Sequence, residues 1–99
     1  MKFPDAITPD AVKGLVKKCN KLTNIDLGRN DMINNDVLAS MGENCKDLEY
    51  LLVRRCPQVT AVGLSFVASH CKKLRAVFIR YDLEDKNSLR ALYPNITFC

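Results

Sequence analysis

The five cysteines are the residues best able to do chemistry in this sequence, because thiolates bind zinc and act as nucleophiles. Cys45, Cys56 and Cys71 lack the C-x-x-C spacing of zinc sites, and the chain has a single histidine. The number of cysteines is odd and the first residues lack an apolar secretion signal, so we expect a reducing compartment instead of a disulfide framework. We expect no metal and no cofactor.

Other catalytic arrangements are also missing from the sequence. His70 and Cys71 are neighbours in the chain, which makes their side chains point in different directions and prevents a nucleophilic pair. The acidic residues around position 45 form no convergent carboxylate pair, and the four glycines are too scattered for a phosphate-binding loop. We therefore predict that the protein is not an enzyme.

The spacing of the cysteines gives them a structural meaning. Cys19, Cys45 and Cys71 are each 26 residues apart, and the segments that follow them read LTNIDLGRN, LEYLLVRRC and LRAVFIRYD. The apolar alternation in these segments predicts a short strand with one buried face in each unit. The three cysteines are then expected to stack as buried packing residues. Asn30 and Cys56 occupy the same position in successive units, at the turn that leaves the strand, where short polar side chains form hydrogen bonds with the backbone.

The second half of each unit has the pattern of a helix. Thr8, Asn34 and Thr60 form a column of N-cap residues, and Pro9 suits the first helical position. Gly63 is among the small residues expected to let the helices pack closely. Apolar residues three positions apart then face inward, as Val12/Leu15, Leu38/Met41 and Leu64/Val67.

Alternating strands and helices at a fixed period predict an α/β leucine-rich repeat solenoid, a right-handed β/α superhelix with a short parallel sheet and outer helices. The length of 99 residues predicts a single domain over 1–99. Met1–Phe3 fall where a strand would finish, so we expect either that the solenoid continued further or that something covers this edge. Ile96 and Phe98 are expected to form a final capping strand. The domain divides into a partial unit 1–18, full units 19–44 and 45–70, and a shortened unit 71–99.

The 26-residue unit, as in CKDLEYLLVRRCPQVTAVGLSFVASH, resembles the cysteine-containing leucine-rich repeats of F-box proteins. The resemblance covers roughly residues 7–99 and implies a horseshoe that binds proteins. No F-box-like segment precedes the repeats, so it does not imply a ubiquitin-ligase adaptor.

The layout from Leu22 to Phe98, with its shortened last repeat, is similar to the family of mitochondrial ATP synthase coupling factor B and the distal membrane-arm assembly proteins. This second resemblance implies an accessory or assembly subunit of a respiratory or ATP synthase complex. The expected location is intracellular, in the cytoplasm or at the mitochondrial inner membrane. No apolar run reaches membrane-spanning length.

The strand pattern places its variable positions on the open face of the sheet. Leu52 and Phe78 are expected there as exposed neighbours, about 5 Å apart on adjacent strands, which is unusual unless something covers them. Five of the six arginines fall on the same face, and none of the nine lysines does. The predicted partner-binding residues are Asp26, Arg29, Tyr50, Leu52, Arg54, Arg55, Arg75, Phe78, Arg80 and Tyr81.

An apolar and aromatic centre with an arginine rim is typical of protein-binding hot spots. We therefore expect a protein partner with an apolar knob and acidic surroundings. A solvated open sheet is the plain alternative. RNA binding is another, because arginines and tyrosines stack on bases and hold phosphates. Asp26 and Glu49 on the same face, and a net charge of only +4, favour a protein over nucleic acid.

Overall fold

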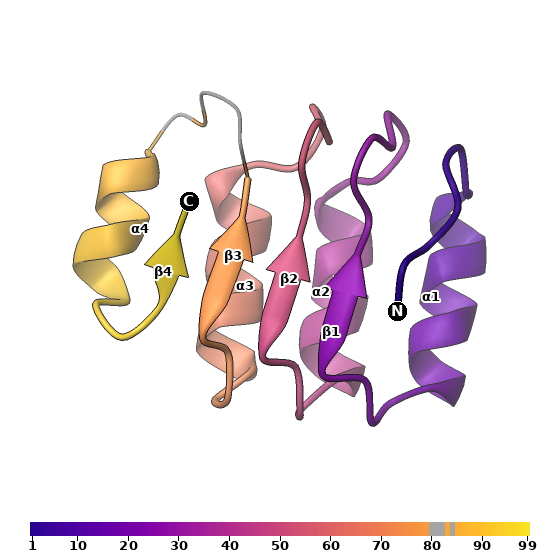
Figure 1. Cartoon of the computed structure of the whole chain (residues 1–99), viewed down its shortest axis with the longest axis horizontal. Helices are drawn as coiled ribbons and strands as arrows, with labels where there is room; N and C mark the ends of the chain where they lie inside the picture. The colour runs from indigo at the N-terminus through magenta and orange to yellow at the C-terminus, as the bar shows by residue number, and fades with distance from the viewer. Residues whose placement is uncertain (80–82, 84) are drawn as a thin grey trace.

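The computed structural model describes residues 1–79, 83 and 85–99, and it has one α/β fold with two layers. A parallel sheet of four strands runs in chain order, formed by β1 (Asn24–Asp26), β2 (Tyr50–Leu52), β3 (Ala76–Phe78) and β4 (Thr97–Phe98). One face of this sheet is covered by the helices α1 (Pro9–Lys18), α2 (Asn35–Asn44), α3 (Ala61–His70) and α4 (Lys86–Leu92) (Figure 1). The predicted α/β class with a parallel sheet is confirmed.

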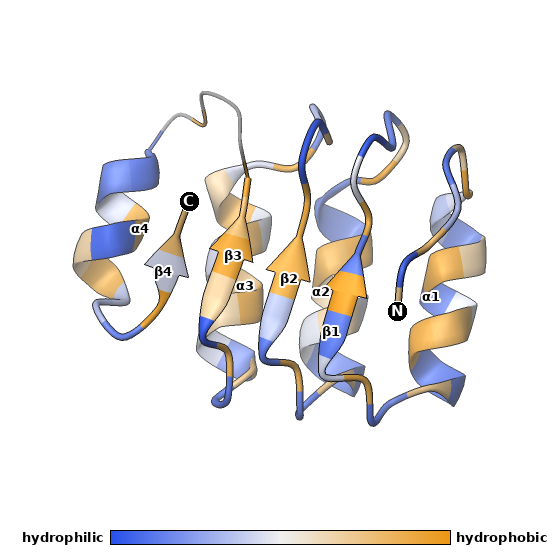
Figure 2. Cartoon of the chain, viewed as in Figure 1, coloured by the Kyte–Doolittle hydropathy of each residue, from blue (hydrophilic) through white to orange (hydrophobic). Residues whose placement is uncertain are grey.

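The strands pair in a register that follows the 26-residue spacing. Ile25 on β1 pairs with Leu51 on β2, and Leu51 pairs with Val77 on β3. All three side chains are fully buried between the sheet and the helices, and the strands form the apolar centre of the molecule in Figure 2. Because strand side chains alternate between faces, the residues beside them lie on the uncovered face.

The cysteine column packs as expected where both of its sides are covered. Cys45 and Cys71 are buried in the core, and the Cys71 thiol donates a hydrogen bond to the carbonyl oxygen of Cys45 over 3.3 Å. Cys19 differs because it follows α1, the helix at the N-terminal end of the molecule, and its side chain is only half-buried. A thiol suits this column because it fills a small apolar space and still satisfies a backbone carbonyl.

Helix capping follows the sequence in two units and departs from it in the third. The Thr8 hydroxyl and the Asn34 side chain accept hydrogen bonds from backbone N–H groups three residues on. Thr60 occupies the N-cap position of α3, but its side chain does not cap the helix. The Thr60 hydroxyl accepts from Asn35 Nδ2 over 2.8 Å, and the Thr60 N–H donates to Asn35 Oδ1 over 3.0 Å. Asn35 therefore joins α2 to α3.

Two core predictions need correction. Leu15 is only half-buried, and Val16 takes the inward position together with Val12, because residues four apart also share a helix face. Ile96 lies before β4 instead of in it. Its N–H donates to the carbonyl of Tyr93, as the N–H of Leu74 does to Cys71 in the preceding unit. Phe98 alone provides the buried strand position, because the last unit is one residue shorter there.

The first three residues extend the sheet beyond β1. Lys2 forms a parallel bridge with Asp26, and the N–H of Phe3 donates to the carbonyl of Asp26 over 2.9 Å. The amino group of Met1 donates to the carbonyl of Asn24, and the Phe3 side chain is buried in the core. Among the described residues, no helix has the length and apolar character needed to cross a membrane.

Candidate functional site

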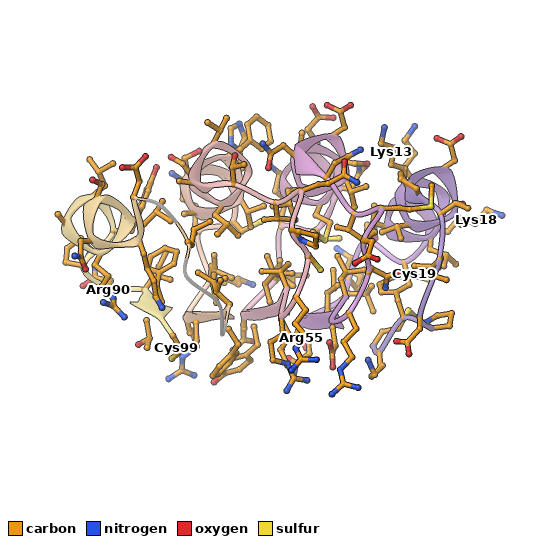
Figure 3. The ribbon with its side chains drawn as sticks, turned by 90° about the horizontal axis from the view of Figure 1, so that it is seen from above. Lys13, Lys18, Cys19, Arg55, Arg90 and Cys99 are labelled. Carbon is orange, nitrogen blue, oxygen red and sulfur yellow. The ribbon has the colours of Figure 1, made fainter. Side chains whose placement is uncertain are left out.

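The uncovered face of the sheet carries an apolar cluster formed by Tyr50, Leu52 and Phe78. Leu52 on β2 and Phe78 on β3 are directly paired in the sheet register, as the sequence predicts. All three side chains are half-buried, so they are less exposed than expected. Neighbouring side chains on one face of a sheet shield each other, because adjacent strands lie only about 5 Å apart. Figure 3 shows the sheet side of the molecule free of helices.

A basic pocket lies beside this cluster, where β1 and β2 end. It is open, has a volume of about 400 Å³, and is lined by Lys2, Asp5, Gly28, Arg29, Arg54 and Arg55. The ends of parallel strands meet at one edge of a sheet, so residues distant in sequence converge there. Sequence spacing correctly placed Arg29, Arg54 and Arg55 on the uncovered face, and the fold gathers them at this edge.

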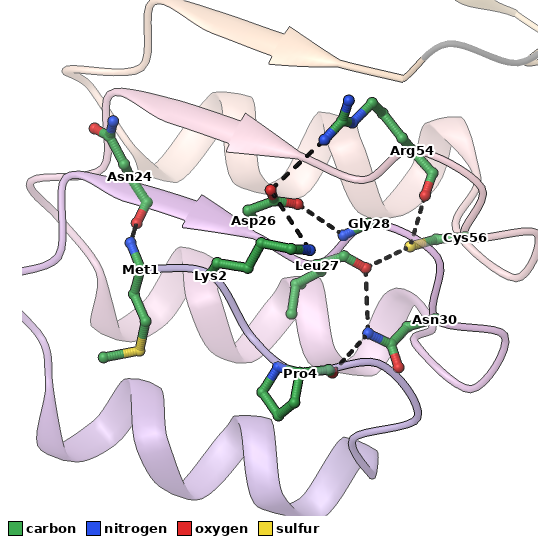
Figure 4. Close-up of polar contacts among 10 residues, drawn as sticks. All are labelled: Met1, Lys2, Pro4, Asn24, Asp26, Leu27, Gly28, Asn30, Arg54 and Cys56. Carbon is green, nitrogen blue, oxygen red and sulfur yellow. Dashed lines mark hydrogen bonds and ion pairs between the residues drawn. The ribbon is translucent and has the colours of Figure 1, made fainter.

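The carboxylate of Asp26 organises one side of the basic pocket (Figure 4). Its Oδ1 accepts a hydrogen bond from the backbone N–H of Gly28 over 2.9 Å. Its Oδ2 lies 3.6 Å from Arg54 Nη2 and 3.7 Å from Lys2 Nζ. These two ion pairs are longer than good hydrogen bonds. The carboxylate therefore orients the two cations without closing a tight bond to either.

The turns after β1 and β2 present their arginines to solvent. Arg29 and Arg55 occupy equivalent positions with positive φ angles of 64° and 56°, an uncommon conformation for a residue other than glycine. The N–H of Arg29 donates to the carbonyl of Arg54 over 2.7 Å, which ties the two turns together. Both side chains are exposed, and Arg55 extends away from the helices (Figure 3).

Buried polar groups behind these turns hold the backbone in place. Asn30 and Cys56 are both fully buried, and both donate to the carbonyl of Leu27, over 3.4 Å and 3.2 Å. The Asn30 amide also donates to the carbonyl of Pro4, which connects the N-terminal segment to the turn (Figure 4). The Asn/Cys position of the repeat therefore bonds the turning backbone, as its residue types predict.

Sequence reasoning missed Lys2. The expectation that no lysine lies on the sheet face is wrong, because Lys2 pairs with Asp26 and lines the basic pocket. The units were recognised by their apolar columns, and Met1–Phe3 contain only the end of such a pattern. The 26-residue register places position 2 opposite Gly28, whereas Lys2 pairs with Asp26 at a spacing of 24 residues, so the repeat did not locate this contact.

The predicted arginine rim is divided between the two ends of the strands. Arg75 precedes β3, at the opposite end of the sheet from the basic pocket, and its Nη1 lies 3.9 Å from Glu49 Oε1. This ion pair is exposed and contributes little to stability. Arg80 and Tyr81 lie outside the described residues. Apart from these two, the structure places each predicted residue on the uncovered face or at its edges.

The buried thiols are poor nucleophiles. Burial, with smaller contributions from the Cys71 and Cys19 thiols, raises the pKa of Cys45 from 9.0 to about 11. Burial likewise raises the pKa of Cys56 and of Cys71. A thiol must lose its proton to attack an electrophile, so these three thiols are held in the unreactive form.

His70 contacts its own helix at the end of α3. Its ring is exposed and stacks on Phe66, with the ring centres 3.9 Å apart. Its Nδ1 lies 2.9 Å from the Phe66 carbonyl oxygen, on the helix face of the molecule and away from the basic pocket.

No family model matches this chain, and no curated protein matches it.

Proposed function

We propose that this protein is a short leucine-rich repeat solenoid that binds a protein partner on its uncovered sheet face and catalyses no reaction. Support for the repeat comes from the strand register at 26-residue intervals and from the buried Cys45 and Cys71 at equivalent positions. Support for binding comes from the composition of the uncovered face. The single observation that carries the proposal is the pairing of Leu52 with Phe78 on that face.

In the isolated protein the apolar side chains of Leu52 and Phe78 contact water, which costs free energy compared with a state in which a partner covers them. Burying apolar surface contributes roughly 25 cal/mol per Å², so covering Leu52, Phe78 and the ring of Tyr50 would favour association. Aromatic side chains lose few rotational degrees of freedom on binding and are frequent in hot spots. The apolar cluster therefore has the chemistry of an anchor for a partner's apolar side chain.

The positive charge near the apolar cluster indicates which residues surround the partner's apolar side chain. The basic pocket is lined by four cationic side chains and Asp5, and Asp26 beside it pairs with two of the cations, which leaves an excess of two positive charges. A partner with acidic residues beside an apolar knob would satisfy both surfaces at once. Complementary charge also speeds association, because it steers the partner before contact.

The proposal is tested by affinity capture with three forms of the immobilised protein. Leu52→Thr with Phe78→Thr removes apolar surface from the sheet face but keeps strand-forming residues. Val62→Thr with Leu92→Thr is the matched control, because both residues are exposed on the helix face. We expect a captured protein that the wild type and the control retain and that the sheet-face variant retains about tenfold less.

Equal capture of the same proteins by all three forms would overturn the proposed binding face. Treating the cell extract used for the capture with ribonuclease distinguishes a protein partner from RNA. Capture that persists after this treatment supports a direct protein contact. Capture that disappears would replace the protein partner with RNA.

A further inference from the structure

The basic pocket has more positive charge than its own carboxylates can neutralise. Lys2, Arg29, Arg54 and Arg55 line it together with Asp5, and the second carboxylate belongs to Asp26. Four like charges held at the ends of two short strands repel each other. An anion bound among them would relieve this repulsion, and in an open pocket it could approach from solvent.

The arginines of this pocket have unused hydrogen-bonding capacity. Within the described part of the chain, no carboxylate lies within ion-pair distance of Arg29 or Arg55. The Nε of Arg54 is buried and has no acceptor there either. Each guanidinium offers a planar set of N–H donors that matches two oxygens of one oxyanion. An unpaired buried donor costs free energy until it finds an acceptor.

We propose that the basic pocket is a binding site for a phosphate monoester. The excess of two positive charges matches the charge of this group, which is close to −2 at pH 7. Its three terminal oxygens can accept from Arg29 and Arg55 at the same time, and Lys2 supplies a further point charge. A carboxylate has one charge and two oxygens, so it would leave half of the excess charge unmatched.

Gly28 lines the pocket without a side chain of its own. A side chain at Gly28 would begin with a Cβ atom only 3.1 Å from Asp26 Oδ1 and 3.7 Å from the carbonyl oxygen of Arg54. Glycine therefore keeps a side chain out of the narrow space beside Asp26 and the Arg54 backbone. The positive φ angles of Arg29 and Arg55 set the direction of both Cα–Cβ bonds before any ligand arrives. Such preorganisation lowers the entropy cost of binding.

The test is a titration of the ¹⁵N-labelled protein followed by amide chemical shifts. The probes are inorganic phosphate, N-acetyl-phosphoserine amide, and a short acidic peptide with one phosphoserine. We expect saturable shifts at Gly28, Arg29 and Arg54, and none at α1. Non-saturable shifts, or shifts of equal size at α1 and at the pocket, would overturn the site.

Variants separate a built site from general attraction to a basic protein. Arg29→Gln with Arg55→Gln should weaken phosphate binding by at least about tenfold. Lys17→Gln with Lys18→Gln changes the net charge equally on exposed positions of α1 and should leave binding unchanged. Equal weakening by both pairs would overturn the proposal. Circular dichroism and thermal melting check that each variant is folded.

A third variant makes the opposite prediction and does not remove any arginine. Asp26→Asn deletes a negative charge and can still accept from the Gly28 N–H. It should tighten phosphate binding by about fivefold, and weaker or unchanged binding would contradict the charge-matching account. The probes also identify the source of the phosphate. Preference for the phosphopeptide over N-acetyl-phosphoserine amide assigns it to a modified protein, and equal affinity assigns it to a small phosphomonoester.

This site does not depend on the proposed protein partner. The variant Leu52→Thr with Phe78→Thr changes no charge, so it should lose protein capture and keep the phosphate-induced shifts. Absence of saturable phosphate-induced shifts in the wild type, with capture retained, would instead overturn the phosphate site and leave the apolar cluster as the binding surface. The two proposals can therefore fail separately.

Discussion

Leu52 on β2 and Phe78 on β3 are paired in register on the sheet face opposite the four helices. Directly before them in the chain, Leu51 and Val77 form the next pair on the opposite face and are fully buried. One strand pair thus carries adjacent apolar residues on two faces with different surroundings. The first pair holds the helices to the sheet, and the second remains available to another molecule.

Adjacent leucines on β2 should therefore respond differently to truncation. Leu51→Ala removes a side chain from the core and should lower the free energy of unfolding by about 3 kcal/mol. Leu52→Ala removes a half-buried side chain from the uncovered face and should cost less than about 1 kcal/mol. Urea unfolding of both variants measures this difference. Equal losses would mean that the uncovered face is part of the folding core.

Two glycines offer a matched test of helix packing. A Cβ at Gly63 on α3 would lie 2.3 Å from Asn35 Oδ1 and 2.9 Å from Leu38 Cδ1. Gly63→Ala should therefore cost about 1–3 kcal/mol, because the added carbon overpacks the contact between α2 and α3. Gly14 on α1 has open space around it, and Gly14→Ala should stabilise the helix by about 0.5–1 kcal/mol. Thermal melting gives both signs.

The buried Cys45 thiol predicts how stability depends on alkaline pH. In the unfolded chain the thiol ionises near its usual pKa of 9.0, whereas in the folded protein the pKa is about 11. The unfolded state therefore binds fewer protons between these values, and stability falls as pH rises from 9 to 11. The expected loss attributable to this thiol is on the order of 2 kcal/mol.

Cys45→Ala is the control for the alkaline loss of stability. Its free energy of unfolding should fall less steeply between pH 9 and pH 11 than that of the wild type, whatever its value at pH 7. The same slope in both proteins would show that Cys45 is not desolvated in the fold. Denaturant unfolding at each pH supplies the comparison.

Arg90 protects the open edge of the sheet. Its Nη2 and Nε donate to the carbonyl oxygen of Phe98 over 2.8 Å and 3.2 Å, and this carbonyl belongs to the edge strand β4. Unpaired edge groups can pair with another chain. Arg90→Ala should therefore increase self-association with rising concentration. Sedimentation measurements check this, and a variant as monomeric as the wild type would contradict the protective role.

The sequence predicted the elements whose side chains repeat in type. The cysteine column, the alternating strands and the helix starts depend on local residue chemistry, and they appear at Cys45, Cys71 and Asn34 as expected. Contacts between units were harder to predict from the sequence, because they depend on exact distances in three dimensions. Asn35 binds Thr60 across two helices, and Lys2 reaches Asp26 across 24 residues. Neither pair forms a repeating column.

Side-chain exposure on the sheet face was also beyond the sequence pattern. Periodicity assigned Leu52 and Phe78 to the correct face, but their mutual shielding depends on the packing of both strands. The basic pocket required the turns after β1 and β2 to adopt positive φ angles at Arg29 and Arg55. Arginine does not favour that conformation by itself, so only the fold identifies it.

Hydroxyl-radical footprinting of the complex with a captured protein tests the central claim most directly. The labelling rates of Tyr50, Leu52 and Phe78 are compared with those of Val62 and Leu92, which are exposed on the helix face. The proposed binding face predicts that the partner strongly reduces labelling of the first three side chains and leaves the last two unchanged. Unchanged labelling of Tyr50, Leu52 and Phe78, with protection of Val62 and Leu92, would contradict it.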